Sequence, residues 1–193
     1  MNNKPLHLFV GPSASGKTSV ANILEDPMYA WNKVYKQIQS YTTRPPRYDG
    51  EKGHVFISDD EFNKLTDLVA YTEYNGYKYG TTQEQLDEVD IYVVDIPGVE
   101  TLLENYESRR VIYIWYFDSH ITTRIERMIL RGDLSASIIS RLRTDEAFNW
   151  YDKLQILVDY FTTFKNKKVF LEKVNAEVEL RFLANEMNSK LGG

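Results

Sequence analysis

The chain has 193 residues, a length that predicts one domain at about 100–200 residues per domain. Its 28 acidic and 23 basic residues give a net charge of −5, which disfavours a general binder of nucleic acid or anionic membranes. The lack of cysteine excludes disulfides and cysteine zinc sites. The longest apolar run, Val111–Phe117, is far shorter than the about 20 residues that cross a bilayer. We therefore expect a cytoplasmic protein with no nucleic-acid or membrane partner.

Short apolar runs alternate with longer amphipathic stretches along the chain. Strands are predicted at Leu6–Val10, Ile91–Val94, Val111–Tyr116 and Lys168–Leu171, with a weaker fifth at Val34–Gln39. Helices are predicted at Lys17–Glu25, Gly98–Glu107, Ser119–Leu130 and Ala176–Leu191, with Asn175 as the N-cap of the last. Near-continuous apolar strands suit a parallel sheet that is covered on both faces. The alternation therefore predicts an α/β domain with a parallel sheet flanked by helices.

Two regions interrupt this alternation. Residues 40–89 carry turn signals at Arg44-Pro-Pro, Asp49-Gly50 and Asn75-Gly76 between Tyr- and Thr-rich segments, which predicts a small inserted β-rich lobe. Arg131–Arg143 lies between predicted helices and is expected to form a mobile flap. These boundaries predict a core of about residues 1–39, 90–124 and 145–193, the inserted lobe at about 40–89 and a lid at about 125–144.

A glycine-rich segment follows the first predicted strand and precedes the first predicted helix. Gly11-Pro-Ser-Ala-Ser-Gly-Lys-Thr18 matches the phosphate-loop pattern G-x-x-x-x-G-K-[ST] in the context that this pattern requires. The amides of such a loop cradle phosphate oxygens, the lysine contacts the β and γ phosphates, and the hydroxyl binds Mg²⁺. We therefore predict ATP binding, with Thr18 on the metal. The predicted ATP-binding residues are Gly11, Ser13, Ala14, Ser15, Gly16, Lys17, Thr18 and Ser19.

The segment Ser40-Tyr-Thr-Thr-Arg-Pro-Pro-Arg47 opens the inserted lobe. Arginine grips phosphate through two N–H groups, and the prolines stiffen the loop and so reduce the cost of ordering it on binding. An exposed basic turn is the alternative, and the position directly after a phosphate-loop unit disfavours it. The segment is a candidate site for a second, phosphate-bearing substrate.

Together the two segments resemble the guanylate kinase family, which carries a Gly-Pro-Ser-x-Ser-Gly-Lys-Thr loop and then a Ser-x-Thr-Thr-Arg-x-Pro-Arg segment. The resemblance covers about residues 5–145 and continues in Gly53–Ser58, Asn75–Thr81, Val93–Ile96 and the spacing of Arg127, Arg131 and Arg141. It implies a P-loop NTPase-type fold with a small acceptor-binding lobe and a helical lid. It also implies ATP-dependent phosphorylation of a nucleoside monophosphate, GMP or dGMP, with Mg²⁺.

The resemblance further implies roles for single residues. Contacts to the acceptor would come from Ser40, Arg44, Arg47, His54, Tyr79, Thr81 and Asp95. Of these, Arg44, Arg47 and Tyr79 would hold its phosphate and Thr81 would face its base. Asp95 would lie near the metal or its water shell, or orient the acceptor. Phosphoryl transfer depends on positioning and charge neutralisation, so the catalytic residues would be Lys17, Arg44, Arg127, Arg131 and Arg141.

Three positions depart from the family pattern. The family's second Asp after the strand is missing, since the sequence runs Asp95-Ile-Pro-Gly98. His54 stands where the family has a Tyr. It can bond a phosphate, and protonation would strengthen that bond. The alternative is that His54 lies in a surface turn and has no contact with the acceptor. Ala70 stands where the family has a guanine-reading Glu. Glu73 lies an odd number of residues from Tyr79 and would face the other side of a strand unless a bulge re-aims it. The sequence therefore leaves the base of the acceptor open.

Arginines cluster before and within the predicted lid. Arg124, Arg127 and Arg131 are spaced three and four apart and share a helix face. These arginines either neutralise the charge of the triphosphate or form a solvated helix face. We expect Arg127, Arg131 and Arg141 to neutralise the triphosphate, and Arg124 and Arg143 to lie at the periphery.

Two other functions remain open. One is a kinase for a different nucleotide or small phosphate acceptor. The other is a non-catalytic guanylate kinase-like module that binds a protein; the presence of Lys17 and Thr18 disfavours it, because such modules tend to lose the ATP loop. We expect a monomer or homodimer. The sequence says little of Tyr151–Lys168 beyond a packing role for its aromatic residues.

Overall fold

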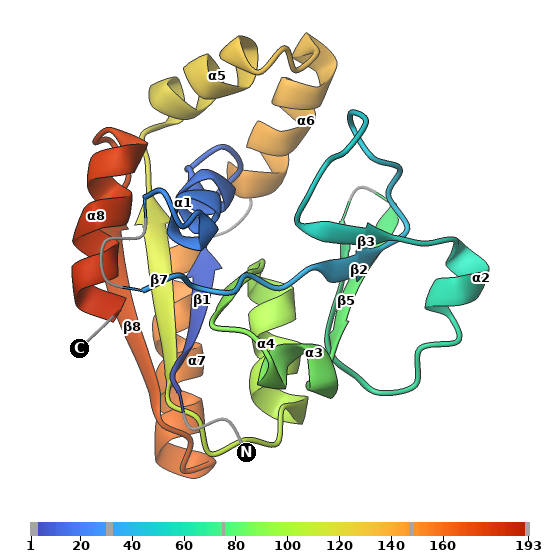
Figure 1. Ribbon diagram of the computed structural model, residues 1–193, viewed down its shortest axis with the longest axis vertical. Coiled ribbons are helices and arrows are strands. Elements are labelled where there is room, and N and C mark those ends of the chain that lie inside the picture. The colour runs from blue at the N-terminus through green and yellow to red at the C-terminus, as the bar shows by residue number, and fades with distance from the viewer. Residues whose placement is uncertain (1–3, 30–32, 75, 147–148, 192–193) are drawn as a thin grey trace.

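The computed structural model describes residues 4–29, 33–74, 76–146 and 149–191, which form two sheets with helices around them (Figure 1). The core sheet is parallel and has the strand order β6-β1-β7-β8. Its strands are β1 (Leu6–Val10), β6 (Ile91–Val93), β7 (Ile112–Asp118) and β8 (Val169–Asn175). The predicted α/β fold class is therefore confirmed.

Helices cover both faces of the core sheet. One face carries α1 (Lys17–Glu25) and α8 (Leu180–Leu191), and the other carries α4 (Ile96–Asn105) and α7 (Trp150–Phe164). Successive strand side chains point to opposite faces, so Phe9 packs with α1 and α8 while Leu8 packs with α4 and α7. Burial on both faces explains why every residue of β1 is apolar or fully enclosed.

The second sheet builds the small lobe, residues 40–89, and has the strand order β3-β2-β5-β4. Its elements are β2 (Ser40–Thr42), β3 (His54–Phe56), α2 (Asp59–Phe62), β4 (Leu68–Tyr74), β5 (Tyr77–Thr82) and α3 (Gln83–Asp87). The backbone N–H of Tyr71 donates to Thr101 Oγ1 at 3.1 Å, so β4 is attached to helix α4 of the core. Asn75 of the predicted turn lies outside the described residues.

The predicted flap is mostly helical. Helices α5 (Ile121–Leu130) and α6 (Ser135–Glu146) lie above the carboxyl ends of the core strands in Figure 1. Between them the chain turns at Gly132, whose φ of 83° lies in the left-handed region that favours glycine. The two helices face the small lobe across the phosphate loop, in the place where a lid would act.

Among the predicted element boundaries that are wrong, three have clear local reasons. Val34–Gln39 is not a strand: it makes one bridge, Gln37 to Ile91, because Lys36 O accepts from both Asp90 N–H and Ile91 N–H. The last helix starts at Leu180, since Asn175 ends β8 and its side chain accepts the Glu177 N–H. Helix α4 starts at Ile96, earlier than predicted, because Asp95 caps it.

Of the helices in the described part of the chain, none is both long and apolar enough to cross a bilayer.

Candidate active site

The phosphate loop connects β1 to α1 and is held in a tight, inward-facing conformation. Gly11 has a φ of 147°, and a Cβ there would meet the Phe117 carbonyl oxygen at 2.6 Å, so only glycine fits. Lys17 folds back over the loop and donates from Nζ to Gly11 O and Pro12 O, each at 2.7 Å. Burial lowers the pKa of Lys17 to about 8, and the neighbouring carboxylate of Asp145 opposes that shift.

The remaining residues of the loop divide between its two sides. Thr18 is exposed at the start of α1 and lines the main cavity, while Ser19 is exposed and outside that lining. Ala14 has a φ of 59°, and Ser15 is fully buried. Arg127 Nη1 donates to Ser15 O at 3.1 Å. The predicted lid arginine Arg127 therefore supports the back of the loop.

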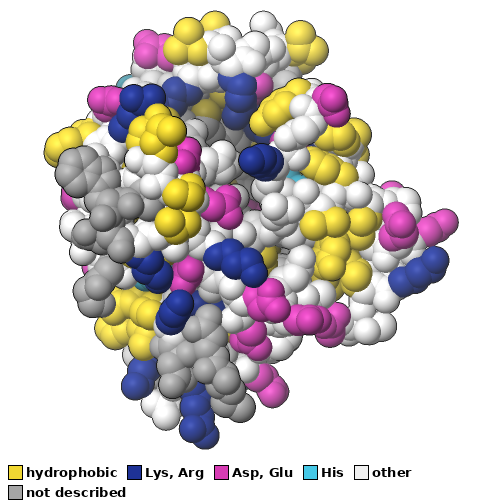
Figure 2. Space-filling view, viewed as in Figure 1, with side chains coloured by type: hydrophobic (Ala, Val, Ile, Leu, Met, Phe, Trp, Pro, Cys, Tyr) yellow, Lys and Arg dark blue, Asp and Glu magenta, His cyan; other side chains and the backbone are white. Residues whose placement is uncertain are grey.

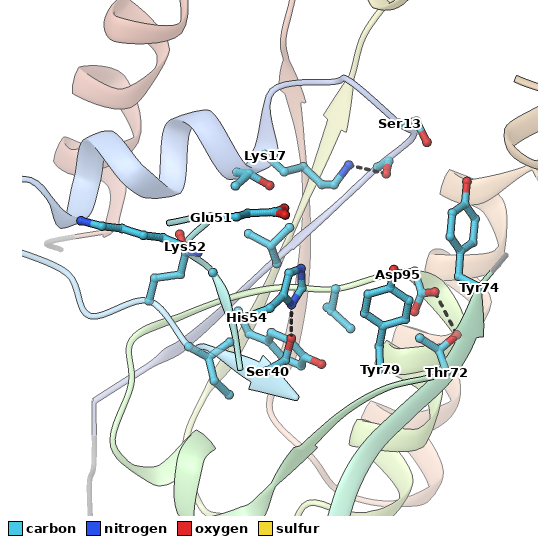
Figure 3. A pocket seen from close by; sticks show the side chains of 18 of the residues that line it. Ser13, Lys17, Ser40, Glu51, Lys52, His54, Thr72, Tyr74, Tyr79 and Asp95 are labelled. Atoms are coloured by element: carbon cyan, nitrogen blue, oxygen red, sulfur yellow. Dashed lines mark hydrogen bonds between the residues drawn. The ribbon is translucent and has the colours of Figure 1, made fainter. Parts of the chain in front are cut away.

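The phosphate loop and the small lobe face one cavity of about 240 Å³ (Figure 3). The loop contributes Gly11, Ser13, Lys17 and Thr18. The small lobe contributes Ser40, Arg47, Glu51, His54, Thr72, Tyr74 and Tyr79, and the end of β6 contributes Asp95. Residues that are far apart in the sequence, and that were assigned to two different substrates, thus meet at the carboxyl ends of the core strands, where ligands of α/β sheets bind.

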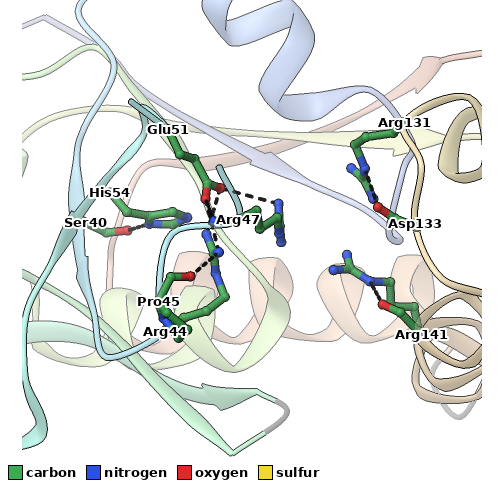
Figure 4. A network of polar contacts seen from close by, with 10 residues as sticks. Ser40, Arg44, Pro45, Arg47, Glu51, His54, Arg131, Asp133 and Arg141 are labelled. Atoms are coloured by element: carbon green, nitrogen blue, oxygen red, sulfur yellow. Dashed lines mark hydrogen bonds and ion pairs between the residues drawn. The ribbon is translucent and has the colours of Figure 1, made fainter. Parts of the chain in front are cut away.

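The two arginines of the small lobe share one carboxylate. Glu51 binds Arg44 through two parallel bonds, Nη2 to Oε1 at 2.8 Å and Nη1 to Oε2 at 3.2 Å. The same carboxylate accepts the backbone N–H of Arg47 at 2.6 Å (Figure 4). Arg44 also lies against the ring of Phe56, 5.4 Å from its centroid. Glu51 and Phe56 thus fix the arginine loop before any anion arrives.

His54 lies in β3 and lines the cavity, so it is not a surface-turn residue. Its Nδ1 is 3.0 Å from Ser40 Oγ. Burial, and next the positive charge of Arg44, lower the pKa of His54 to about 4. This low pKa disfavours protonation near neutral pH, so we expect any bond from His54 to the phosphate to come from the neutral ring.

The face of β4 that looks into the cavity lacks a carboxylate. Ala70 is fully buried, and Thr72 Oγ1 donates to Asp95 Oδ2 at 3.0 Å. Glu73 pairs with Lys78 on the opposite face and accepts a short bond from the Tyr71 hydroxyl, so the register irregularity between Leu68 and Ala70 does not re-aim it. Buried Thr81 donates to Gln85 Oε1 at 2.9 Å and is not among the lining residues.

Asp95 lies two residues after the end of β6 and lines the cavity. Its Oδ1 accepts the Gly98 N–H at 3.0 Å, which caps helix α4 and fixes the carboxylate. Burial raises the pKa of Asp95, and the bonds from Gly98 and Thr72 oppose that rise.

The lid arginines face the small lobe across the cavity. In Figure 4, Arg131, bonded to Asp133, and Arg141 lie opposite the Arg44–Arg47 side. Burial lowers the pKa of Arg47, and the charges of Arg44 and Arg141 lower it further, which places these cations within reach of one another. In Figure 2 dark blue side chains lie around a hollow on this face. Such a group of cations needs an anion between its members.

Besides Glu51, two residues at the phosphate loop were missed by the sequence analysis. Arg124, expected to be peripheral, is 7% exposed and pairs with Asp145 at 3.3 Å. Asp145 accepts the Ser13 N–H at 3.0 Å and belongs to the wall of the main cavity. The same two residues also line a second cavity at the ends of β7 and β8. Arg124 and Asp145 are 21 positions apart, so no local sequence pattern links them. They come together because α6 folds back onto the phosphate loop.

Donor atoms for a divalent cation are present in a form that suits Mg²⁺. Within residues 4–29, 33–74, 76–146 and 149–191, no group of three or more His, Cys, Asp or Glu side chains forms a metal cage. Mg²⁺ in nucleotide enzymes is held by one or two protein oxygens together with phosphates and water. The exposed Thr18 hydroxyl and the Asp95 carboxylate on the same cavity wall fit that mode of binding.

Comparisons with known proteins agree with this arrangement. No family model matches the chain. It is 28% identical over 190 residues to a guanylate kinase of Photobacterium profundum, covering 89% of this chain and 88% of that one. It is 35% identical over 99 residues to a guanylate kinase of Baumannia cicadellinicola, about 47% of each chain. The crystal structure of guanylate kinase from Anaplasma phagocytophilum shares the fold, with a TM-score of 0.53 at 18% identity, covering 100% of this chain and 86% of that one. A sequence relationship over nearly the full length of both chains, with the same fold, makes this chain similar to guanylate kinases.

Proposed function

We propose that this protein transfers the terminal phosphoryl group of ATP to GMP, with dGMP as a second acceptor. One observation carries the proposal: the phosphate loop with Lys17 and the small lobe with Arg47 line the same cavity. A donor triphosphate on the loop and an acceptor phosphate at the arginines would then face each other. The curated relatives are named guanylate kinases, which supports GMP as the acceptor.

On the donor side, the chain supplies positive charge and fixed amides. Lys17, now bonded to Gly11 O and Pro12 O, would turn its ammonium toward the transferring phosphate. Thr18, with Asp95 through water, would hold a Mg²⁺ ion, which when bound neutralises phosphate charge. Arg131 and Arg141 would approach from the lid side and stabilise the charge that develops in transfer.

On the acceptor side, the residues hold and orient a phosphate that needs no activation. The second pKa of a phosphate monoester is about 6, so it is largely ionised at pH 7 and no strong base is required. Arg44 and Arg47, preset by Glu51, would hold this phosphate together with Tyr79. Closure of the lid over the cavity would exclude water, whose attack would hydrolyse ATP.

The base of the acceptor would be read without the carboxylate at position 70. The polar groups on the cavity wall include the Thr72 and Tyr74 hydroxyls, from the same strand as Ala70, and the Asp95 carboxylate. The Tyr74 hydroxyl is buried and has no hydrogen-bond partner among the described residues, so it is available to a base. Together these groups can donate to and accept from a purine edge.

A coupled assay of ADP release tests the proposal directly. The protein, ATP and Mg²⁺ are combined in turn with GMP, dGMP, AMP, CMP, UMP and dTMP, with Lys17→Ala as the inactive control. ADP release with GMP and dGMP is expected. Release with another monophosphate alone would keep the kinase and overturn the base. Silence with all six, while calorimetry still detects GMP binding, would indicate the non-catalytic binding module instead.

A further inference from the structure

A buried carboxylate lies at the phosphate loop. One oxygen of Asp145, Oδ2, accepts the Ser13 N–H at 3.0 Å and contacts Arg124 Nη2 at 3.3 Å. The Arg124 and Asp145 side chains are 8% and 4% exposed, so the pair is almost fully removed from water. An amide of a phosphate loop and a guanidinium are the donors that a phosphate oxygen takes in nucleotide sites. The carboxylate oxygen thus has the partners of a phosphate oxygen.

We propose that Arg124 is a further phosphate-binding residue for the donor nucleotide, and that Asp145 is an internal anion that holds its place until ATP displaces it. The proposal rests on the kinase function given above, but it concerns only the binding of ATP. It adds an arginine outside the group of lid arginines expected from the family resemblance.

The charges around the pair favour an exchange of one anion for another. Arg124 Nε is buried and has no hydrogen-bond partner in the part of the chain that is described, so the guanidinium has unused donor capacity. Lys17 feels both members of the pair, attracted by Asp145 and repelled by Arg124. A triphosphate arriving at Lys17 would repel the Asp145 carboxylate and compete for the same two donors.

The surroundings of Asp145 allow its side chain to leave without unfolding the helix. Trp150 Nε1 donates to the Asp145 carbonyl oxygen at 3.0 Å, which anchors the main chain at the end of α6. Asp145 is a lining residue of both cavities, so its side chain has open volume nearby. Arg141 lies four residues earlier on the same helix, so a movement of this helical turn would shift a lid arginine as well.

The first test changes the internal anion. Asp145→Asn keeps the shape and removes the charge, so the dissociation constant for ATP with Mg²⁺, measured by calorimetry without acceptor, is expected to fall about threefold to tenfold. The melting temperature of the nucleotide-free protein should fall, while the rise produced by ATP should become larger. Asp118→Asn is the matched control: Asp118 lines the second cavity and pairs with Lys173 at 2.8 Å, without contact to the loop.

The second test changes the arginine. Arg124→Gln should weaken ATP binding about 10- to 100-fold and leave the dissociation constant for GMP unchanged, because the acceptor arginines lie in the small lobe. Arg124→Lys keeps a cation beside Asp145 and should recover part of the ATP affinity. This variant replaces Arg124→Gln in the binding measurement if the Gln variant folds poorly. In the Arg124→Gln background, Asp145→Asn should no longer tighten ATP binding.

Weaker or unchanged ATP binding in folded Asp145→Asn would overturn the role of Asp145, and unchanged ATP binding in Arg124→Gln would overturn that of Arg124. These outcomes are independent of the acceptor. If the wild-type protein binds ATP but phosphorylates none of the six monophosphates, the proposed function fails while both variants still decide this inference.

Discussion

Glu51 binds Arg44 through both oxygens of its carboxylate, and both side chains are more than nine-tenths buried. The same carboxylate accepts the Arg47 N–H. Two arginines that would otherwise repel each other are thereby held side by side, Arg47 in the wall of the cavity and Arg44 buried outside that lining. A buried ion pair of this kind stabilises little by itself, but the loss of one partner leaves an uncompensated charge.

Glu51→Gln should therefore damage acceptor binding more than donor binding. We expect the KM for GMP to rise about 10- to 100-fold with the KM for ATP within twofold, because the arginine loop loses its anchor while the phosphate loop is untouched. The free energy of unfolding should fall by about 3 kcal/mol in the same variant, measured by urea titration. Glu73→Gln, on the opposite face of β4, is the control, and equal effects of the two changes on GMP would contradict the role of Glu51.

Lys17 should give ATP binding a pH dependence in the alkaline range. Its pKa is lowered to about 8, so the ammonium loses its proton as the pH rises through 8, and the affinity for anionic ATP should fall there. Calorimetry between pH 7 and 9.5 measures this, with proton uptake on binding near pH 8. Lys17→Arg keeps its charge over that range and should bind ATP with little pH dependence. A wild-type affinity that stays constant up to pH 9.5 would refute the prediction.

His54 should act as a neutral hydrogen-bonding residue. With a pKa of about 4, it carries no charge between pH 5.5 and 8. The ratio of wild-type to His54→Gln kcat/KM for GMP should therefore stay constant over this range, although both values change as the acceptor phosphate ionises. His54→Phe, which leaves Ser40 Oγ without this partner, should raise the KM for GMP about tenfold. A ratio that changes near pH 6.5 would show a titrating histidine.

Arg141 and Arg143 provide a matched pair in the lid. Arg141 faces Arg47 across the cavity, whereas Arg143 is exposed. Arg141→Ala should lower kcat about 10- to 1000-fold, since it removes charge stabilisation that is strongest in the transition state. Arg143→Ala should leave steady-state kinetics unchanged. If both variants behave alike, the lid acts through its overall charge and not through a placed arginine.

His7 should make the fold sensitive to acid. It is 2% exposed, its Nδ1 accepts from Trp115 Nε1 at 3.2 Å, and burial lowers its pKa to about 4. The unfolded chain binds this proton near pH 6.5, so between pH 6.5 and 4 it holds more protons than the folded chain. The free energy of unfolding should fall by up to about 3 kcal/mol as the pH falls through this window.

His7→Gln keeps an acceptor for Trp115 and removes the titration, so its unfolding free energy should depend less on pH over the same window, as measured by urea titration at each pH. Tyr113→Phe keeps the ring that stacks on His7 at 5.5 Å and should retain the wild-type dependence. Identical slopes for wild type and His7→Gln would contradict the prediction.

Local patterns were enough for the contiguous parts of the molecule. β1 and α1 have the predicted bounds, because an apolar run, a glycine-rich turn and an amphipathic helix are each defined by near neighbours. The boundaries failed where side chains take backbone bonds: the Asp90 carboxylate accepts the Lys36 N–H, and the Asn175 side chain accepts the Glu177 N–H. The arginines of the small lobe were found by their segment, but their anchor Glu51 was not, since a single Glu in a turn has no distinguishing pattern.

The sequence by itself determined the phosphate loop, because that motif consists of consecutive residues. It also carried the resemblance to guanylate kinases, through two segments with a distinctive order. The tertiary structure alone decided that His54 is uncharged, that Glu73 faces away from the cavity, and that Arg124 and Asp145 meet at Ser13. The physical reason is that burial and charge pairing depend on which distant segments come into contact, and no spacing along the chain encodes those distances.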